Sequence, residues 1–334
     1  MTAVPALSVE GLSVEFRTRS GTVRALDNVS FAVGKGETIA LVGESGSGKS
    51  VTAYAVMGIL DPAGKVTAGR AVLGGLDLLA AKPSQLAEVR GRELAMIFQN
   101  PRTALNPIRP VGRQIADVLV RHGNVPRREA PERAIEMLRA VGITDPARRA
   151  KAYPFEMSGG MCQRVMIAIA LAAKPSLLIA DEPTTGLDVT TQAVIMDLVA
   201  ELAEKLGMAT IFITHDLALA GQRSSRIVVM HAGHVVENAP TRELFAHPRH
   251  PYTAELIAAT PDAAASLDEL ASVPGALPDL RRADLPPCRY SERCPRKIDA
   301  CAQPLPQATG SGHIIACWNP LPLRVIDRPT ESAA

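Results

Sequence analysis

The feature that most constrains this chain is the stretch from residue 43 to residue 50, which fits the phosphate-loop pattern G-x-x-x-x-G-K-[ST] at every position. The apolar run Thr38–Val42 before it is typical of a buried strand, and residues 51–60 after it are predicted to form a helix. Backbone N–H groups of such a loop and helix face a bound polyphosphate. The residues predicted to hold phosphate are Gly43, Glu44, Ser45, Gly46, Ser47, Gly48, Lys49 and Ser50.

Two side chains of this loop have distinct expected roles. Lys49 should reach the β- and γ-phosphates of a nucleotide, and the Ser50 hydroxyl should bind the Mg²⁺ that bridges them. The alternative is a glycine-rich turn that only joins a strand to a helix. Because both residues stand at the required positions, the sequence favours a nucleotide-binding protein.

Composition limits the other functions open to the chain. The 334 residues are 47% hydrophobic, enough for one large domain with an appendage or for two domains. The longest apolar runs, such as residues 166–173, are far shorter than the roughly 18 residues of a membrane span, and the N-terminus does not read as a secretion signal. We therefore expect a cytosolic chain, unless a partner holds it at a membrane. A formal net charge of +2 with 3% aromatic residues does not favour nucleic acid as a ligand.

Alternating stretches before the phosphate loop predict antiparallel strands. They are residues 9–16 and 29–33, with a turn at residues 20–21 between further short strands. Phe16 has two equally weighted interpretations, an aromatic that stacks on an adenine ring and an ordinary core residue. Residues 64–75, beyond the first helix, are glycine-rich and are expected to be turn-like.

Another buried strand is predicted at residues 93–98, ending at Gln99. A glutamine at a strand end is well placed to respond to a nucleotide, although a single glutamine is a weak signal. Residues 100–110 hold three prolines and are expected to be irregular. Residues 111–150 are typical of amphipathic helices inserted in an α/β domain, and their solvated face is expected to carry Arg127, Arg128 and Arg133.

A second potential anion site follows at Ser158-Gly159-Gly160, directly before an apolar helix at about residues 165–173. A hydroxyl and free amides at a helix N-terminus attract anions. Because one loop already holds the nucleotide phosphates, a second such site suggests closure on a nucleotide held by another subunit. The alternative is an ordinary helix cap with flexible glycines.

Polar residues end two more predicted strands. Residues 177–182 end in Asp181 and Glu182, and residues 209–214 are followed by His215. Asp181 is expected to orient the water shell of Mg²⁺, and Glu182 to polarise the water that attacks the γ-phosphorus. His215 can contact the γ-phosphate or that water. Polar groups at four strand ends in this order are hard to explain as packing.

The order of these motifs resembles the ATPase subunits of ATP-binding cassette transporters. The matching positions are the phosphate loop, Gln99, Ser158-Gly159-Gly160, Asp181-Glu182, Asp188 and His215. Four phrases are similar to the oligopeptide/dipeptide importer branch, at residues 98–101, 105–107, 158–161 and 247–253. Met157 and Cys162 depart from the usual residues, and the Cys162 change bears on the fine contact across an ATPase dimer.

The resemblance implies an α/β fold of the P-loop NTPase class. It implies an ATPase domain at residues 1–245, with an antiparallel β subdomain and a helical subdomain at about residues 100–175, and a small cysteine-containing C-terminal extension at residues 246–334. It assigns catalysis to Glu182, His215 and Gln99, and Mg²⁺ binding to Ser50, Gln99 and Asp181. The nucleotide contacts that it adds to the phosphate loop are Phe16, Gln99, Ser158, Gly159, Gly160, Asp181 and Asp188.

The resemblance also implies cofactors and partners. The family binds ATP and Mg²⁺ between head-to-tail paired ATPase domains, so a second ATPase subunit, in this branch usually a different chain, must join this one. Two transmembrane permease subunits and, indirectly, an extracytoplasmic substrate-binding protein complete the importer, which places this chain at the cytoplasmic face of the inner membrane as a peripheral subunit. The implied activity is ATP hydrolysis coupled to import of di- or oligopeptides. The alternatives are another cargo, such as a nickel chelate or glutathione, and a non-transport cassette ATPase with an iron–sulfur sensor.

Four of the five cysteines lie in the extension with the spacing C-x5-C-x6-C-x15-C, at Cys288, Cys294, Cys301 and Cys317. Thiols gathered in a cytosolic chain suggest a metal site, and the spacing does not choose between zinc and an iron–sulfur cluster. Importer relatives with a similar extension carry a [4Fe–4S] cluster, which favours that cofactor over zinc. The neighbouring basic residues Arg289, Arg293, Arg296 and Lys297 are expected to offset the cluster charge. Free surface thiols are the alternative.

Overall fold

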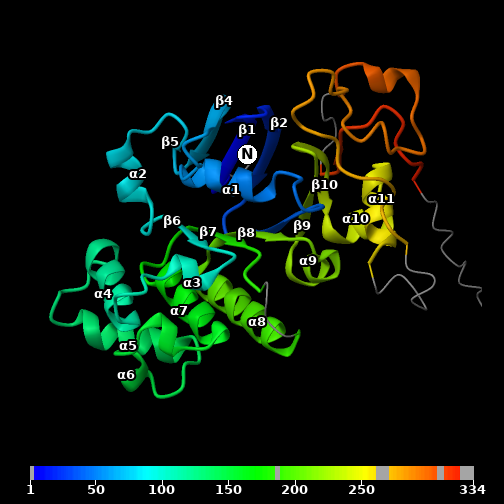
Figure 1. Cartoon of the computed structure of the whole chain (residues 1–334). Helices are drawn as coiled ribbons and strands as arrows, with labels where there is room; N and C mark the ends of the chain where they lie inside the picture. Colours follow the sequence, from blue (N-terminus) through cyan, green and yellow to red (C-terminus); the bar gives the residue numbers. More distant parts are fainter. Residues whose placement is uncertain (1–3, 185–188, 261–270, 307–311, 324–334) are drawn as a thin grey trace, which may run out of the picture.

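The computed structural model describes residues 4–184, 189–260, 271–306 and 312–323 of the chain. Two β-sheets and several groups of helices form an α/β fold (Figure 1), which confirms the expected fold class. The larger sheet has the strand order β11-β10-β9-β3-β8-β7-β6. In chain order its strands are β3 (Thr38–Val42), β6 (Leu94–Ile97), β7 (Leu177–Asp181), β8 (Ala209–Thr214), β9 (Arg226–His231), β10 (His234–Pro240) and β11 (Ile314–Ile315).

The centre of the larger sheet is parallel, since β3 pairs with β8 and β9, and β7 pairs with β6 and β8 in the same direction. Every residue of β7 and β8 is buried, as expected for parallel strands covered on both faces. The predicted strands at residues 38–42 and 209–214 are confirmed. Parallel strands bring their carboxyl ends to one edge of a sheet, and that edge collects the segments after β3, β6, β7 and β8.

The smaller sheet is antiparallel, with the order β2-β1-β4-β5. Its strands are β1 (Leu7–Thr18), β2 (Gly21–Val33), β4 (Gly64–Leu73) and β5 (Leu76–Asp77). The predicted strands and the turn at residues 20–21 are confirmed. The expectation of a turn-like segment at residues 64–75 was wrong, because β4 pairs with β1 along most of its length. Gly69 marks an irregularity in that pairing, where a Cβ would lie 2.6 Å from the Gly11 backbone.

Helix α1 (Lys49–Met57) lies between the two sheets and shares a buried apolar core with both. It begins inside the phosphate loop and stops at Gly58, whose φ of 65° is the left-handed conformation that ends helices. The predicted helix at residues 51–60 therefore exists with shifted bounds.

A second core holds the helical part of the chain, below the larger sheet in Figure 1. Its helices are α3 (Pro101–Ala104), α4 (Val111–His122), α5 (Ala130–Ala140), α6 (Pro146–Arg149), the 3₁₀ turn η1 (Pro154–Glu156), α7 (Gly159–Leu171) and α8 (Val189–Leu206). The predicted helical insertion and its exposed Arg127, Arg128 and Arg133 are confirmed. Residues 100–110 are not wholly irregular, because the Asn100 side chain caps α3, with Pro101 at its first position. Helix α2 (Pro83–Val89) lies apart, beside β5.

The C-terminal part packs on the edge of the larger sheet, away from the helical part (Figure 1). It follows α9 (Leu217–Arg223) and α10 (Thr241–Ala246) and contains α11 (Pro251–Ala258), the 3₁₀ turn η4 (Asp299–Ala302) and β11. Strand β11 pairs with β10, and a third core includes Tyr252 and Tyr290. The proposed boundary at residues 245–246 therefore falls at the C-terminal end of α10, in a region where both sides share a core. Among the helices of the described ranges, none combines the length and apolar character needed to cross a membrane.

Candidate functional site

The phosphate loop takes a backbone path that only glycine permits at two positions. Gly43 has a φ of 148°, and a Cβ there would lie 2.1 Å from the Met230 carbonyl oxygen. Gly48 has a φ of 105°, and its Cβ would lie 2.6 Å from a methyl carbon of Leu26. Both contacts are far shorter than van der Waals distance, so the glycines of the motif are required by packing as well as by backbone conformation.

Lys49 is buried at the base of the loop. Its Nζ donates hydrogen bonds to the carbonyl oxygens of Gly43, at 2.7 Å, and of Glu44, at 3.0 Å. Burial lowers the pKa of Lys49, while the nearby charges of Glu182, Asp181 and Glu44 raise it. A phosphate group that enters the loop would offer this ammonium group a charged acceptor in place of carbonyl oxygens.

Ser50 and Asp181 form the second part of the site. The Ser50 hydroxyl donates to Asp181 Oδ1 at 2.9 Å. Within the described part of the chain, the other carboxylate oxygen, Oδ2, is buried and meets no donor at hydrogen-bond distance. Burial raises the pKa of Asp181, Ser50 lowers it, and the neighbouring charge of Glu182 raises it. A hydroxyl beside a buried carboxylate with a spare oxygen suits Mg²⁺, which takes oxygen ligands.

The three residues predicted to be catalytic lie together. Gln99 Nε2 donates to Glu182 Oε2 at 2.8 Å, and His215 Nδ1 lies 3.4 Å from Glu182 Oε1. Glu182 has a φ of 43°, a conformation that costs energy in a residue other than glycine and that is concentrated at functional sites. The strand end after β7 is therefore shaped so that one carboxylate faces both the Gln99 and the His215 side chains.

These groups open into one cavity of about 660 Å³. The predicted residues that line it are Phe16, Ser45, Gly46, Gly48, Lys49, Ser50, Gln99, Glu182 and His215. Four further lining residues were not predicted, namely Val23, Ala25, Val51 and Leu280. Asp181 lies behind Ser50, and Gly43, Glu44 and Ser47 form the rest of the loop. Asp188 lies outside the described residues.

Ser158, Gly159 and Gly160 do not line this cavity. Ser158 is exposed, and its Oγ accepts a hydrogen bond from the Met161 N–H at the start of α7, at 3.3 Å. Cys162 is fully buried, its Sγ donates to the Pro154 carbonyl oxygen, and burial raises its pKa. The unusual Cys162 therefore faces the core of its own subunit.

The C-terminal extension reaches the phosphate loop directly, which the sequence did not predict. Arg293 donates to both carboxylate oxygens of Glu44, at 2.8 and 3.1 Å. The Glu44 N–H donates to the Tyr252 hydroxyl at 3.0 Å. Arg289 forms an ion pair with Asp27 at 3.0 Å. Two of the four basic residues expected to offset a cluster charge are therefore paired with carboxylates of the ATPase domain.

The four extension cysteines carry free thiols that lie within electrostatic range of one another. The pKa of Cys288 is raised to about 11, chiefly by burial and in part by the charges of Cys301, Cys317 and Cys294, while a hydrogen bond from the Tyr290 backbone lowers it. Burial is also the main cause of the raised pKa values of Cys294 and Cys317. In the ranges that the structure describes, no group of three His, Cys, Asp or Glu side chains is placed to hold a metal ion, so neither zinc nor an iron–sulfur cluster has support from the geometry.

Comparisons with known proteins agree with this geometry. Residues 26–185 match the family model of the ABC transporter ATPase, and residues 236–301 match that of the oligopeptide/dipeptide transporter C-terminal region. The dipeptide transport ATP-binding protein DppD of Escherichia coli is 45% identical over 318 residues, 94% of this chain and 97% of that protein. The oligopeptide transport ATP-binding protein AppD of Bacillus subtilis is 43% identical over 316 residues, 93% of this chain and 96% of that protein.

Solved structures give the same fold. The ATP-binding cassette MJ0796, described as a dimeric post-hydrolysis state bound to ADP and phosphate, is 28% identical and covers 71% of this chain and 99% of its own, with a TM-score of 0.63. With the phosphate loop, the Gln99–Glu182–His215 arrangement and both family models in one chain, this protein belongs to the ATPase subunits of ATP-binding cassette transporters, in the oligopeptide/dipeptide branch.

Proposed function

We propose that this chain binds and hydrolyses ATP to energise an importer of di- or oligopeptides. The observation that carries the proposal is the convergence of Lys49, the Ser50–Asp181 pair and Glu182 on one cavity, in a chain whose relatives are named as peptide transport ATP-binding proteins.

In this proposal the triphosphate lies in the phosphate loop, with Lys49 against its β- and γ-phosphates. Mg²⁺, when bound, would supply positive charge that stabilises the phosphates, and Ser50 and Asp181, with Gln99, are the residues that would hold it. Glu182 accepts a proton from the attacking water as the water oxygen bonds to the γ-phosphorus. The bond between the γ-phosphorus and the oxygen that leaves with ADP breaks. Gln99 and His215 keep the Glu182 carboxylate in place, because each lies within 3.4 Å of one of its oxygens.

The second half of each ATP site comes from another ATPase subunit. Ser158 is exposed at the start of α7 and outside the cavity of its own subunit, which supports a role facing a nucleotide held by a partner. In this arrangement two chains pair head to tail, and the partner is proposed to be a different chain.

The permease contact is proposed on the helical part. Ile108, after α3, is 82% exposed, and Phe155, in η1, is 74% exposed. Large apolar side chains with this exposure are suited to a protein partner. Gln99 precedes α3 directly, so a movement at the nucleotide can reach this surface along one short segment. Two permease subunits then hold the chain at the cytoplasmic face of the membrane, and an extracytoplasmic binding protein delivers the peptide.

The cysteine set is proposed to hold a [4Fe–4S] cluster. A single zinc ion draws its thiolates to about 2.3 Å each, whereas a cluster gives every thiolate its own iron and leaves the sulfurs farther apart. What supports the proposal is that the four thiols are buried or half-buried and affect one another electrostatically. Anaerobic purification followed by iron, sulfide and zinc analysis tests this. Iron near four per chain is expected, and stoichiometric zinc without sulfide would contradict the proposal.

Uptake of labelled peptide tests the proposed cargo. Proteoliposomes that contain the permeases, both ATPase subunits and the binding protein should accumulate a dipeptide or tripeptide when ATP is present on the side of this chain. Lys49→Ala in this chain should abolish uptake. Transport of a nickel chelate or glutathione but not of peptides would assign another cargo, and uptake that Lys49→Ala leaves intact would contradict the role of this site.

A further inference from the structure

We propose that the C-terminal extension forms one wall of the nucleotide site, with Leu280 packed against the base and ribose of the bound nucleotide. The inference rests on the proposed position of the triphosphate in the phosphate loop. It assigns to the extension a part in nucleotide binding by its own subunit.

The extension meets the cavity at Leu280 and the phosphate loop at Leu277. Leu280 is half-buried and lines the cavity together with Phe16 of β1 and with Val23 and Ala25 of β2. Leu277 lies beside the phosphate loop, where a Cβ placed on Gly46 would come within 3.4 Å of a Leu277 methyl carbon. The segment from residue 277 to residue 280 therefore covers the side of the cavity that faces the antiparallel sheet.

Hydrogen bonds and ion pairs fix the backbone on both sides of Leu280. The Arg24 N–H of β2 donates to the Leu280 carbonyl oxygen at 3.1 Å. The Arg281 side chain donates two hydrogen bonds to the Asp279 carboxylate, each at 2.8 Å, and another to the Ser20 hydroxyl at 3.2 Å. The segment is thus attached to the β1–β2 hairpin at the residues immediately around Leu280.

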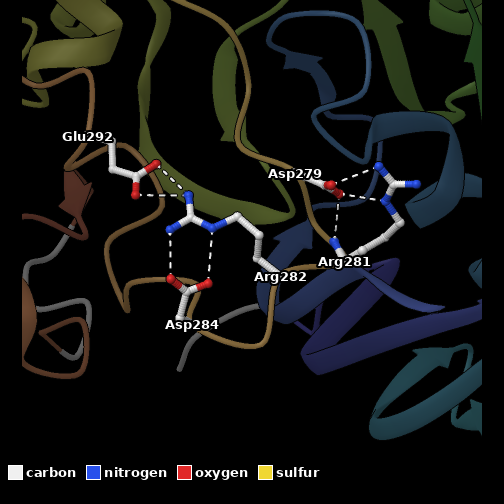
Figure 2. Close-up of polar contacts among 5 residues, drawn as sticks. All are labelled: Asp279, Arg281, Arg282, Asp284 and Glu292. Carbon is white, nitrogen blue, oxygen red and sulfur yellow. Dashed lines mark hydrogen bonds and ion pairs between the residues drawn. The ribbon is translucent and has the colours of Figure 1, made fainter. Parts of the chain in front are cut away.

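Ion pairs of Arg282 connect this segment to the rest of the extension. The Arg282 guanidinium lies between the carboxylates of Asp284 and Glu292, at 3.1 and 2.9 Å, as Figure 2 shows. Figure 2 also shows the neighbouring Asp279–Arg281 pair. Glu292 is followed by Arg293, which binds Glu44 of the phosphate loop. The segment at residues 277–280 and the Arg293 contact with the phosphate loop therefore belong to one continuous stretch of chain. The ion pairs within that stretch can hold Leu280 in a defined position.

The distribution of polar and apolar residues in the cavity indicates which part of the nucleotide Leu280 contacts. The polar lining residues Lys49, Ser50 and Glu182 belong to the phosphate loop and to a strand end of the larger sheet, whereas the apolar Phe16 and Leu280 belong to β1 and to the extension. A triphosphate against the polar residues leaves the nucleoside to the apolar residues. The flat faces of a purine pack on aromatic rings and on aliphatic side chains, so Phe16 and Leu280 provide the apolar contacts for a purine nucleoside.

Equilibrium binding of ATP and of inorganic tripolyphosphate to the full chain tests this inference. Leu280→Ala should weaken ATP binding roughly fivefold, because apolar contact area is lost, and leave tripolyphosphate binding unchanged. Leu280→Met should bind ATP within about twofold of the unmodified protein. Leu285→Ala is the matched control, because Leu285 is a half-buried leucine of the same extension that does not line the cavity. It should bind both ligands normally.

Two results would overturn the inference: unchanged ATP affinity in Leu280→Ala, or an equal loss of ATP and tripolyphosphate affinity, which would show an effect on the phosphate loop alone. If Leu280→Ala does not fold, Leu280→Gln answers the same question, because a neutral amide of similar size removes the apolar contact and should reduce ATP binding and spare tripolyphosphate. Lys49→Ala separates this inference from the proposed function. It should lose both ligands, and if it binds both normally the proposed ATP position itself is wrong.

Discussion

Arg293 of the extension and Glu44 of the phosphate loop form a two-pronged ion pair, with distances of 2.8 and 3.1 Å between the guanidinium nitrogens and the carboxylate oxygens. The Arg293 side chain is 5% exposed, so water screens this pair less than a surface pair. Arg293 stands next to Cys294 in the chain. The same short segment therefore joins the cysteine set to the loop that is proposed to bind phosphate.

Replacement of Arg293 should change nucleotide use. Arg293→Ala removes both donors from Glu44 and should raise the KM for ATP roughly tenfold, because charge-assisted hydrogen bonds are lost from the loop. Arg293→Lys keeps the positive charge but lacks the planar guanidinium group, so its KM for ATP should lie between those of the unmodified protein and Arg293→Ala. Arg296→Ala is the control, since Arg296 bonds Asn319 within the extension. Equal KM values for Arg293→Ala and Arg296→Ala would exclude a positioning role for Arg293.

Glu182→Gln should bind ATP but stall. The amide keeps the size of the side chain and loses the base, so turnover should fall by about 10²–10⁴-fold while the Kd for ATP changes little. Glu201→Gln is a matched control on α8, where Glu201 is exposed and pairs with Lys205. Single-turnover hydrolysis and nucleotide binding measure the two effects separately. Near-normal turnover of Glu182→Gln would assign the base to another residue.

Two glycine substitutions should have opposite effects on folding. At Gly43 a Cβ would clash with the Met230 carbonyl oxygen at 2.1 Å, so Gly43→Ala should lower the free energy of unfolding by about 2–4 kcal/mol. At Gly159 a Cβ meets no described atom within 4 Å, so Gly159→Ala should fold with unchanged or slightly higher stability. Chemical denaturation measures both.

Gly159→Ala should nevertheless reduce ATP turnover in the assembled pair of subunits, because the methyl group lies at the surface proposed to approach the partner nucleotide. Binding of ATP to the isolated chain should be unaffected. Normal turnover in the assembled complex would argue that this surface does not contact a nucleotide.

Two buried histidines should make stability depend on pH. Burial, with a contribution from Arg293, lowers the pKa of His231 from 6.5 to about 3, and burial lowers that of His250 to about 4. Above pH 6.5 both are neutral in the folded and unfolded chains and add no pH dependence. As the pH falls from 6.5 towards 4, the unfolded chain binds protons first, so each histidine should cost about 1.4 kcal/mol of stability per pH unit.

Urea denaturation at pH 7.5 and pH 5.0 measures this loss. His231→Gln keeps an acceptor for Arg293, which lies 3.1 Å from His231 Nε2, and removes the titrating ring. Its stability should therefore fall less between the two pH values than that of the unmodified protein. The same fall in both proteins would show that His231 does not contribute to the acid sensitivity.

The sequence predicted the parts of the site that depend on short-range pattern. The phosphate loop, the strands Thr38–Val42 and Ala209–Thr214, and the polar strand ends at Gln99, Glu182 and His215 are all where local motifs indicated. Parallel pairing of buried strands then brings those ends together, so the proximity of Gln99, Glu182 and His215 follows from fold class and local pattern.

The missed features depend on contacts between distant parts of the chain. Nothing near Arg293 in the sequence indicates that it pairs with Glu44, and the apolar Leu280 stands in a polar, proline-rich tail. The glycines of residues 64–75 led to the wrong prediction of a turn-like segment. Gly69 allows the β4 backbone to approach Gly11 of β1 closely, and a glycine needed for such an approach cannot be distinguished in the sequence from a glycine of a turn.

The most direct test of the central claim is the rate of ATP hydrolysis by the membrane-reconstituted complex, measured with and without peptide and its binding protein. Coupled import predicts hydrolysis that rises on addition of peptide, requires the permeases, and is lost when this chain carries Glu182→Gln. Hydrolysis that is indifferent to peptide and permeases would leave the ATPase chemistry intact and contradict its role in peptide import.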